Sequence, residues 1–157
     1  MNKESLRAAV LAKLEDELAR QTHAALDSRE ESISEESRAE NKYDTHAQEA
    51  AYLAEGQAKL AAELAAGISA WRSFAFPSEG HYCVQLGSLV TLVAGPRTDL
   101  LLLGPSNGGL ALTHDDTEIT VVTPSSPIGR ALLGRTTGAV LPPPRKGAPA
   151  PRIAALA

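Results

Sequence analysis

Hydrophobic residues in the first half of the chain recur at helical spacing. Residues 3–72 are rich in Ala, Leu, Glu, Gln and Arg and contain no proline, a composition that favours helix. The apolar positions fall three, four or seven residues apart in two series. The first series consists of Leu11, Leu14, Leu18 and Ala25, and the second of Ala50, Leu53, Leu60, Leu64 and Trp71, with Gln57 filling one position. This heptad-like spacing predicts two helices that pack along a common seam.

An almost entirely polar segment separates the two series. Residues 27–44 contain seven acidic and three basic residues, and Ile33 and Tyr43 are their only large apolar side chains. Such a segment cannot lie in a core, so we expect two antiparallel helices with the segment at their far turn and a tip at about 30–44. The alternative is a single unbroken helix, whose seam would need a second copy of the chain to cover it.

The pattern changes at Ser73 from helical spacing to short β-like runs. Pro77 and Gly80 mark a linker into a second domain. The expected strands are residues 88–93, 100–103, 110–113 and 118–123, with turns at Gly95-Pro96 and at 106–109. Residues 128–133 fit one or two helical turns, and a Pro-rich stretch near 142–151 precedes a last edge strand at 152–156. The predicted fold is α+β: a helical hairpin at 1–73 followed by a small β-rich domain at 80–157.

Charge divides along the same boundary. The 157 residues carry a net charge of −4. Residues 1–72 hold 14 acidic and 9 basic residues, whereas residues 73–157 hold 5 and 6. The negative net charge gives no overall excess of positive charge for binding nucleic acid directly. No apolar run approaches the ~20 residues that a membrane-spanning helix needs, and no signal peptide is expected.

Cysteine and histidine offer little chemistry. Cys83 is the single cysteine, which excludes an internal disulfide and fits a reducing cytoplasm. The four histidines are scattered without metal-ligand spacing, so a structural zinc site is not expected. We expect Cys83 to be a small buried residue at the start of a strand.

Two motifs, one in each half, have the order of a known family. The first is Ser126, Pro127, Gly129, Arg130, Ala131, Leu132, Leu133 and Gly134, preceded by the strand at 119–123. The second is Glu40-Asn41, followed by Glu49, Leu53, Glu55 and Gly56. With the hairpin and β-rich domain, these motifs resemble the bacterial GreA/GreB transcript-cleavage factors, in a short divergent Gre-like subgroup. The resemblance implies an N-terminal coiled coil, an FKBP-like C-terminal domain that binds RNA polymerase, and a hairpin tip that enters the secondary channel.

The resemblance also implies chemistry at the tip. In the family, an Asp and a Glu three residues later help to hold a second Mg²⁺ at the polymerase active centre, where two metals cleave backtracked RNA. Glu40 matches the glutamate, but Ser37 stands at the aspartate position, and Tyr43 and Asp44 exchange the family's order. Glu36, four residues before Glu40 on one helical face, or Asp44 would complete the pair, with Asn41 and Ser37 as supporting residues. The chain would hold no cofactor of its own and would share Mg²⁺ with the polymerase, without being an enzyme itself.

The second set of predicted contacts lies in the C-terminal motif. The resemblance assigns Ser126, Pro127, Gly129 and Arg130 to polymerase binding, with Arg130 offering a bidentate fork to an acidic partner. The structural alternative is a solvent-facing arginine on a short helix whose other face, formed by Ile128, Leu132 and Leu133, fills the core. Separately, we expect Trp71 to pack with Phe74 and Phe76 where the second helix meets the β-rich domain.

These observations support one main function and several alternatives. The main hypothesis is a cytoplasmic regulator of transcription elongation that binds RNA polymerase, contacts nucleic acid only indirectly through the elongation complex, and stimulates cleavage of backtracked RNA. The alternatives are a channel-occupying regulator without cleavage activity, a structural or dimerising coiled-coil module, and an acidic turn that only solubilises the hairpin. No membrane partner is expected, and the chain would be a monomer or weak dimer. A prolyl isomerase has little support in a chain with only two Phe, three Tyr and one Trp.

Overall fold

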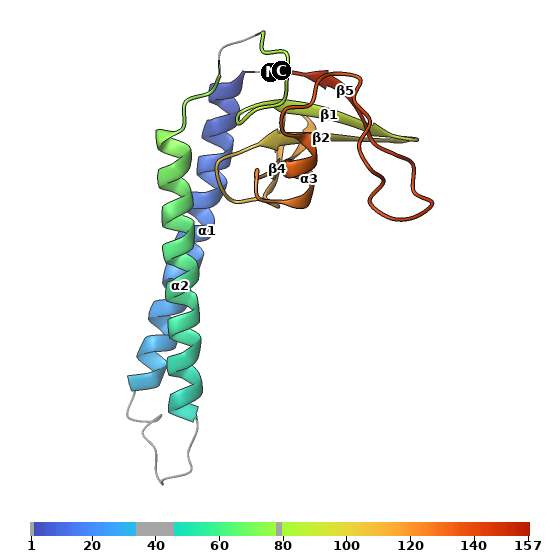
Figure 1. Ribbon diagram of the computed structural model, residues 1–157. Helices are drawn as coiled ribbons and strands as arrows, with labels where there is room; N and C mark the ends of the chain where they lie inside the picture. Colours follow the sequence, from blue (N-terminus) through green and yellow to red (C-terminus); the bar gives the residue numbers. More distant parts are fainter. Residues whose placement is uncertain (1, 34–45, 78–79) are drawn as a thin grey trace. The chain divides into compact units, whose positions relative to one another are not determined.

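The computed structural model describes residues 2–33, 46–77 and 80–157 of the chain (Figure 1). The described residues form two compact units. One unit combines residues 2–10 with residues 70–157, and the other lies within residues 11–69. The sheet domain therefore includes the beginning of the first helix and the end of the second.

Two long helices form the hairpin. Helix α1 spans Lys3–Ile33 and helix α2 spans His46–Ser73, and they run antiparallel to each other (Figure 1). Asn2 caps α1, because its Oδ1 accepts a hydrogen bond from the backbone N–H of Glu4 at 2.9 Å. The predicted hairpin is confirmed, and the alternative of a single unbroken helix is wrong.

The seam of the hairpin is less buried than its spacing predicts. Leu14 is buried, but Leu53 and Leu60 on α2 expose 53% and 47% of their surface. An open groove of about 440 Å³ lies between the helices, lined by Thr22, Ala25, Leu26, Ala54, Glu55, Ala58 and Ala61. Since most of these side chains are short, they leave the space between the helices unfilled.

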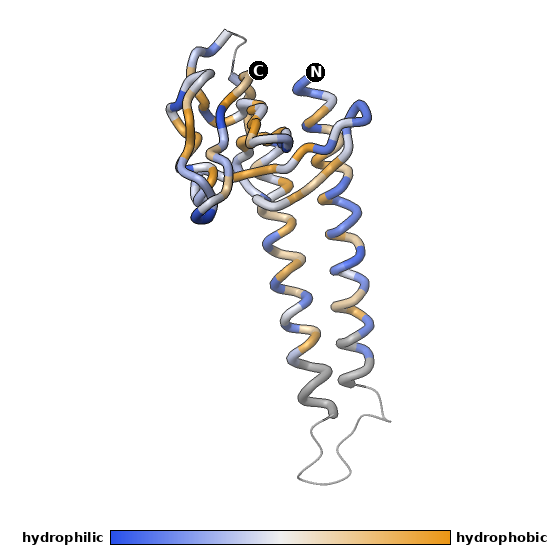
Figure 2. Tube along the Cα trace, turned by 90° about the vertical axis from the view of Figure 1, so that its right-hand side faces the viewer, coloured by the Kyte–Doolittle hydropathy of each residue, from blue (hydrophilic) through white to orange (hydrophobic). Residues whose placement is uncertain are grey.

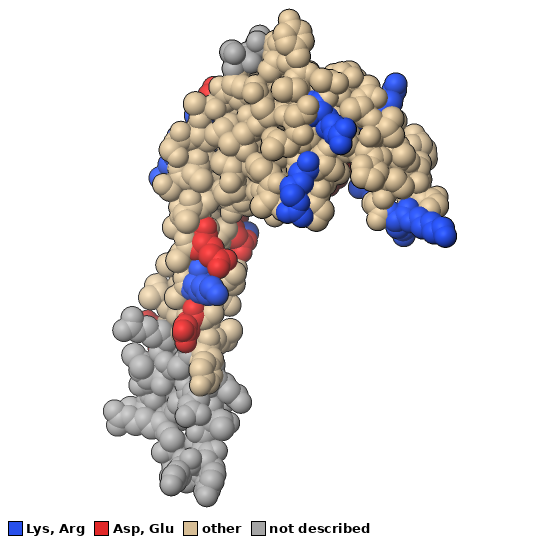
Figure 3. Space-filling model, viewed as in Figure 1, with Lys and Arg blue, Asp and Glu red and all other residues tan. Residues whose placement is uncertain are grey.

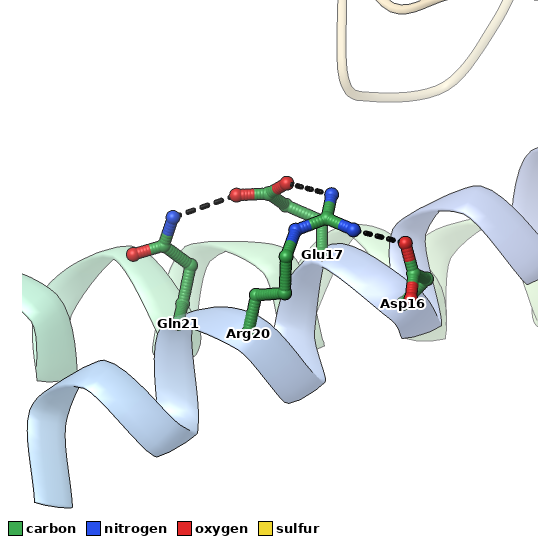
Figure 4. Close-up of polar contacts among 4 residues, drawn as sticks. All are labelled: Asp16, Glu17, Arg20 and Gln21. Carbon is green, nitrogen blue, oxygen red and sulfur yellow. Dashed lines mark hydrogen bonds and ion pairs between the residues drawn. The ribbon is translucent and has the colours of Figure 1, made fainter.

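A polar cluster supports the exposed face of α1 (Figure 4). The guanidinium of Arg20 pairs with Asp16 and with Glu17, and Gln21 Nε2 donates to Glu17 Oε1 at 2.6 Å. The hydrogen bond from Gln21, followed by that from Arg20, lowers the pKa of the Glu17 carboxyl. Residues three and four apart are neighbours on a helix, so the cluster arises from local sequence alone.

The second unit is built on a five-stranded mixed sheet. Its strands are β1 Leu89–Ala94, β2 Arg97–Leu103, β3 Ala111–His114, β4 Thr117–Val122 and β5 Arg152–Leu156. Their order is β3-β4-β2-β1-β5, and only the β2–β4 pair is parallel. The α+β class predicted from the sequence is confirmed, and β5 lies at an edge of the sheet as expected.

Strand β2 begins three residues before the apolar run that predicted it. Arg97, Thr98 and Asp99 continue the antiparallel pairing with β1 as far as Ala94. Arg97 Nε also donates to Asp99 Oδ1 at 2.7 Å. Main-chain pairing thus extends the strand into polar residues that no hydrophobic pattern marks.

The core of the sheet domain takes alternate residues from its strands, such as Val90 and Leu92 of β1, and hydrophobic stretches recur along this domain (Figure 2). Its fully or nearly buried residues include Val84, Val90, Leu92, Leu101, Leu103, Leu132, Leu141 and Ile153. Leu141 lies at the start of the Pro-rich stretch, which is anchored where the N–H of Leu141 donates to the carbonyl of Pro151 at 2.7 Å. The two ends of this stretch are therefore joined by a backbone hydrogen bond, and the side chain of Leu141 contributes to the core.

Trp71 occupies the centre of a second apolar contact within the same unit. It is fully buried, and its ring meets Phe74 edge-on with centroids 6.2 Å apart, while Phe74 meets Phe76 at 5.1 Å. Gly104, just after β2, leaves room for the indole, because an added Cβ would lie 2.4 Å from a Trp71 ring carbon. The predicted packing of Trp71 with the two phenylalanines is confirmed.

Two expectations about burial are wrong. Cys83 is only half-buried, and it forms an isolated antiparallel bridge with Thr136 rather than starting a long strand. Leu133 exposes 48% of its surface instead of filling the core, because it follows the last residue of the short helix and adopts an extended conformation with ψ of 129°. Among the described residues, no helix is both long and apolar enough to cross a membrane.

Candidate functional site

The predicted metal-positioning tip falls in the connection between α1 and α2. Its residues are Glu36, Ser37, Glu40, Asn41 and Asp44. They all lie in segment 34–45, outside the described residues, so the tip chemistry stays a prediction. Of the same motif, Leu53 and Glu55 are exposed on α2.

The C-terminal motif forms a tightly closed loop followed by one short helix. Helix α3 spans Pro127–Leu132 and begins with proline at its first position, where a missing N–H costs nothing. Ser126 is the N-cap: its Oγ accepts from the N–H of Gly129 at 3.0 Å and donates to the carbonyl of Thr123 at 2.7 Å. One hydroxyl therefore holds the end of β4 against the start of α3.

Gly129 is required by the same closure. A Cβ at this position would lie 1.9 Å from the carbonyl oxygen of Thr123, far inside any van der Waals contact. The motif's glycine thus allows the helix to approach the backbone that precedes it. The sequence pattern marks Gly129 as a candidate for binding, and the structure gives it a packing role.

Arg130 and Leu133 present the outward side of the motif. Arg130 is exposed, and its Nη1 donates to the carbonyl of Ser125, which fixes the position of the guanidinium. Leu133 is half-exposed beyond the end of the helix. On the inward side Leu132 is fully buried, and Ile128 and Ala131 pack against the core. The motif combines a fixed cation and an exposed apolar side chain on a rigid base.

A shallow groove of about 430 Å³ adjoins this loop. Hydroxyl-bearing residues and glycines dominate its lining, which includes Gly108, Gly109, Thr120, Thr123, Ser125 and Ile128. Thr123 Oγ1 and Ser125 Oγ lie 3.0 Å apart at its edge. Of the motif residues that the sequence singled out, Ser126 also lines this groove.

Sequence reasoning missed three contributors to this region. Thr123 and Ser125 act through their carbonyl oxygens, and Gly108 lies against Thr123, since a Cβ there would be 3.2 Å from a Thr123 methyl carbon. The Thr-Pro-Ser-Ser-Pro spacing around a helix start is a cap signal that would have marked Thr123 and Ser125. Gly108 carries no such local signal, because its contact depends on the approach of a distant loop.

His81 and His114 each contact a serine hydroxyl. His81 Nε2 and Ser88 Oγ lie 2.7 Å apart, and the buried Ser88 Oγ also accepts from the N–H of Gln85 at 3.0 Å. His114 Nε2 lies 3.3 Å from Ser5 Oγ. Within residues 2–33, 46–77 and 80–157, no three His, Cys, Asp or Glu side chains gather as metal ligands would.

The fold and motif define a helical hairpin joined to a small mixed-sheet domain with a capped loop. No family model and no curated protein matches the chain. The solved structure of the GreA factor homolog 1 (Gfh1) protein of Thermus thermophilus is 21% identical, covers 94% of each chain and has a TM-score of 0.36. A structure of the transcription factor Gfh1 is 19% identical, covers 94% of this chain and 93% of that one, and has a TM-score of 0.38. Thermus aquaticus Gfh1 is 20% identical over 92% of each chain, with a TM-score of 0.37. The chain is similar to these Gre-type proteins over almost its whole length.

Proposed function

We propose that this chain regulates transcription elongation by binding RNA polymerase through the C-terminal motif while the hairpin tip enters the secondary channel. The observation that carries the proposal is the capped loop around Ser126, which holds Arg130 and Leu133 exposed on a rigid base. A preorganised surface of this kind loses little conformational entropy on binding. The acidic hairpin and the order of the two sequence motifs support the same function.

At the tip, Glu40 with Glu36 or Asp44 would add carboxylates to a metal site that the polymerase already provides. Oxygen ligands suit Mg²⁺, and a second metal ion would activate the attacking water. In this proposal the polymerase remains the enzyme, and the chain acts in the cytoplasm without a cofactor of its own. This role requires that Ser37, which stands in place of aspartate, still permits metal positioning.

The test is RNA cleavage in a stalled, backtracked elongation complex of the cognate polymerase with Mg²⁺. We expect faster cleavage with the chain present, and loss of that effect in Glu40→Gln with binding retained. Arg130→Ala should weaken binding itself, while Arg20→Ala, an exposed arginine on α1, serves as the matched control. If Glu40→Gln stimulated cleavage by the polymerase as strongly as the unmodified chain does, the proposed role of the tip would be contradicted.

A competition experiment separates the two polymerase-binding functions. Displacement of an authentic cleavage factor without stimulated cleavage would identify a channel-occupying regulator. Neither stimulation nor displacement would overturn the polymerase proposal.

The exposed leucines of the hairpin favour one further candidate, a dimerising coiled-coil module. Leu26, Leu53 and Leu60 each expose about half of their surface, and a second hairpin would cover them. Sedimentation equilibrium of the full chain tests this candidate. A monomer over the whole accessible concentration range would eliminate it.

A further inference from the structure

Positive charge is concentrated in the last quarter of the chain. Residues 119–157 contain no Asp or Glu, and they contain Arg130, Arg135, Arg145, Lys146 and Arg152. The net charge of −4 conceals this segregation, because the acidic residues lie mainly in the first half. A local excess of cations, rather than the overall charge, determines whether a surface attracts a polyanion.

The structure exposes all five cations. Each side chain lies on the surface, and among the described residues none of them forms an ion pair. Figure 3 shows Lys and Arg side chains spread over the sheet domain on the side that it draws, whereas Asp and Glu gather on the hairpin. No carboxylate of the described residues therefore neutralises these cations, although Arg130 also donates to the carbonyl of Ser125.

Backbone pairing brings the segments that carry these residues together. The segment after α3 pairs with the segment before β1, since the N–H of Val84 donates to the carbonyl of Arg135 at 2.7 Å. Val140 pairs with Arg152 at the start of β5, so the two ends of the 141–151 turn are adjacent. Arg145 and Lys146 lie within that turn. We call the exposed side chains of Arg135, Arg145, Lys146 and Arg152, taken together, the basic face.

An unusually exposed aromatic residue borders the basic face. Tyr82 exposes 90% of its surface, the largest fraction among the large hydrophobic residues that the structure describes. It directly precedes Cys83, which bridges Thr136, the neighbour of Arg135. The ring therefore lies on the segment beside Arg135, in solvent, where it contributes nothing to the core.

We propose that the basic face and Tyr82 form a binding site for single-stranded nucleic acid. The arginines would contact successive phosphates, for which the guanidinium fork is well suited, and a base would stack on the Tyr82 ring. Every base has a π-face, so the site would tolerate any sequence. A duplex hides its base faces, which favours a single strand. The inference concerns direct contact with nucleic acid and does not rest on the proposed polymerase binding.

The first experiment measures binding of the full chain to fluorescein-labelled oligouridine and oligothymidine of about 12 nucleotides. Fluorescence anisotropy is recorded over a range of salt concentrations. We expect salt-dependent binding of at least one strand, and comparison of the two identifies RNA or DNA as the preferred ligand. Arg135→Gln combined with Arg152→Gln should reduce the slope of log K against log salt by about 1.4, from two lost phosphate contacts.

Matched variants separate charge from stacking. Arg20→Gln with Lys59→Gln removes the same charge from exposed positions on the hairpin and should leave the slope unchanged. Tyr82→Ala should weaken binding roughly tenfold, and Tyr82→Phe should restore it because the ring is retained. Circular dichroism spectra of each variant verify that the fold is intact.

Four results would overturn the proposal. The first is absence of binding at low salt, and the second is an equal decrease of the salt slope in the hairpin control. The third is unchanged affinity in Tyr82→Ala. The fourth is displacement of the labelled strand by duplex or by polyglutamate as well as, or better than, by unlabelled single strand. The last result would assign the basic face to a duplex or to an acidic protein. Because the assay contains no polymerase, its outcome is independent of the cleavage and competition experiments.

Discussion

At the residue scale, two glycines illustrate how context decides the effect of a methyl group. At Gly129 the added Cβ would collide with the Thr123 carbonyl, and that carbonyl is part of the loop closure by Ser126. At Gly56, in the middle of α2, no atom lies within 4 Å of the added Cβ. Both glycines belong to sequence motifs, but only one of them is required for packing.

Alanine at the two positions should therefore have opposite effects. We expect Gly129→Ala to lower the free energy of unfolding by about 1–3 kcal/mol or more, because backbone must move. Gly56→Ala should raise it by about 0.5–1 kcal/mol through helix propensity. Urea denaturation followed by circular dichroism measures both, and a neutral Gly129→Ala would contradict the close approach of α3 to β4.

Trp71 provides a second residue-scale prediction. It is fully buried, and among the described residues no acceptor lies within reach of its Nε1. Trp71→Ala should lower the free energy of unfolding by about 3–5 kcal/mol, because it leaves a cavity. Trp71→Phe should cost less than half as much, since it keeps most of the apolar contact and removes an unpaired buried donor. Similar losses from the two substitutions would show that the indole nitrogen has a partner.

At the element scale, α1 depends on local charge pairing as well as on its apolar seam. Glu17 accepts from Gln21 and pairs with Arg20, and both contacts favour the ionised carboxylate. These groups are exposed, so the contribution is modest and is screened by salt. It nevertheless has a definite dependence on pH.

The pH dependence follows from the direction of the shift. Because the pKa of Glu17 is lower in the folded chain than in the unfolded one, the stabilisation is complete above the ordinary range of a carboxyl and disappears as the pH falls through the lowered pKa. We expect Glu17→Gln to reduce the melting temperature at neutral pH, with the difference vanishing in strong acid. Glu63→Gln on α2, which makes the same change in charge, is the control. A difference that grows on acidification would refute this account.

At the scale of the whole molecule, the two compact units differ in how much apolar surface they bury. Between residues 11 and 69, only Leu14, Gly67 and Ile68 are buried among the residues whose surface the structure describes. The sheet unit contains nearly all of the remaining buried side chains. Since burial provides most of the stabilisation of a fold, the two units should open at different free energies.

Hydrogen exchange measured by mass spectrometry tests this difference. Amides of β1, β2 and β4 should exchange only through global unfolding, whereas those of α1 and α2 within residues 11–66 should exchange faster by partial opening. The physical reason is that a hairpin with exposed seam leucines loses little buried area when it opens. Equal protection in both units would mean that the hairpin and sheet unfold as one cooperative unit.

The sequence by itself determined the elements and their local closures. Heptad-like spacing predicted α1 and α2, the run at 128–133 predicted α3 to within one residue, and β-like runs predicted each strand to within a few residues. These features depend on neighbours within about one helical turn or on strand alternation, which a linear pattern records. The motif order also indicated a Gre-type architecture, although its acidic tip lies outside the described residues.

The tertiary structure alone decided which distant segments meet. The parallel pairing of β2 with β4, the fit of Trp71 over Gly104, and the pairing that joins the 82–84 segment to Arg135 all link positions far apart in sequence. Long-range pairing also brought the segment of Tyr82 beside that of Arg135 and joined Val140 to Arg152, so exposed cations from separate segments share one domain. Such contacts depend on the whole set of competing burials and backbone pairings, so they cannot be read from any single stretch of the chain.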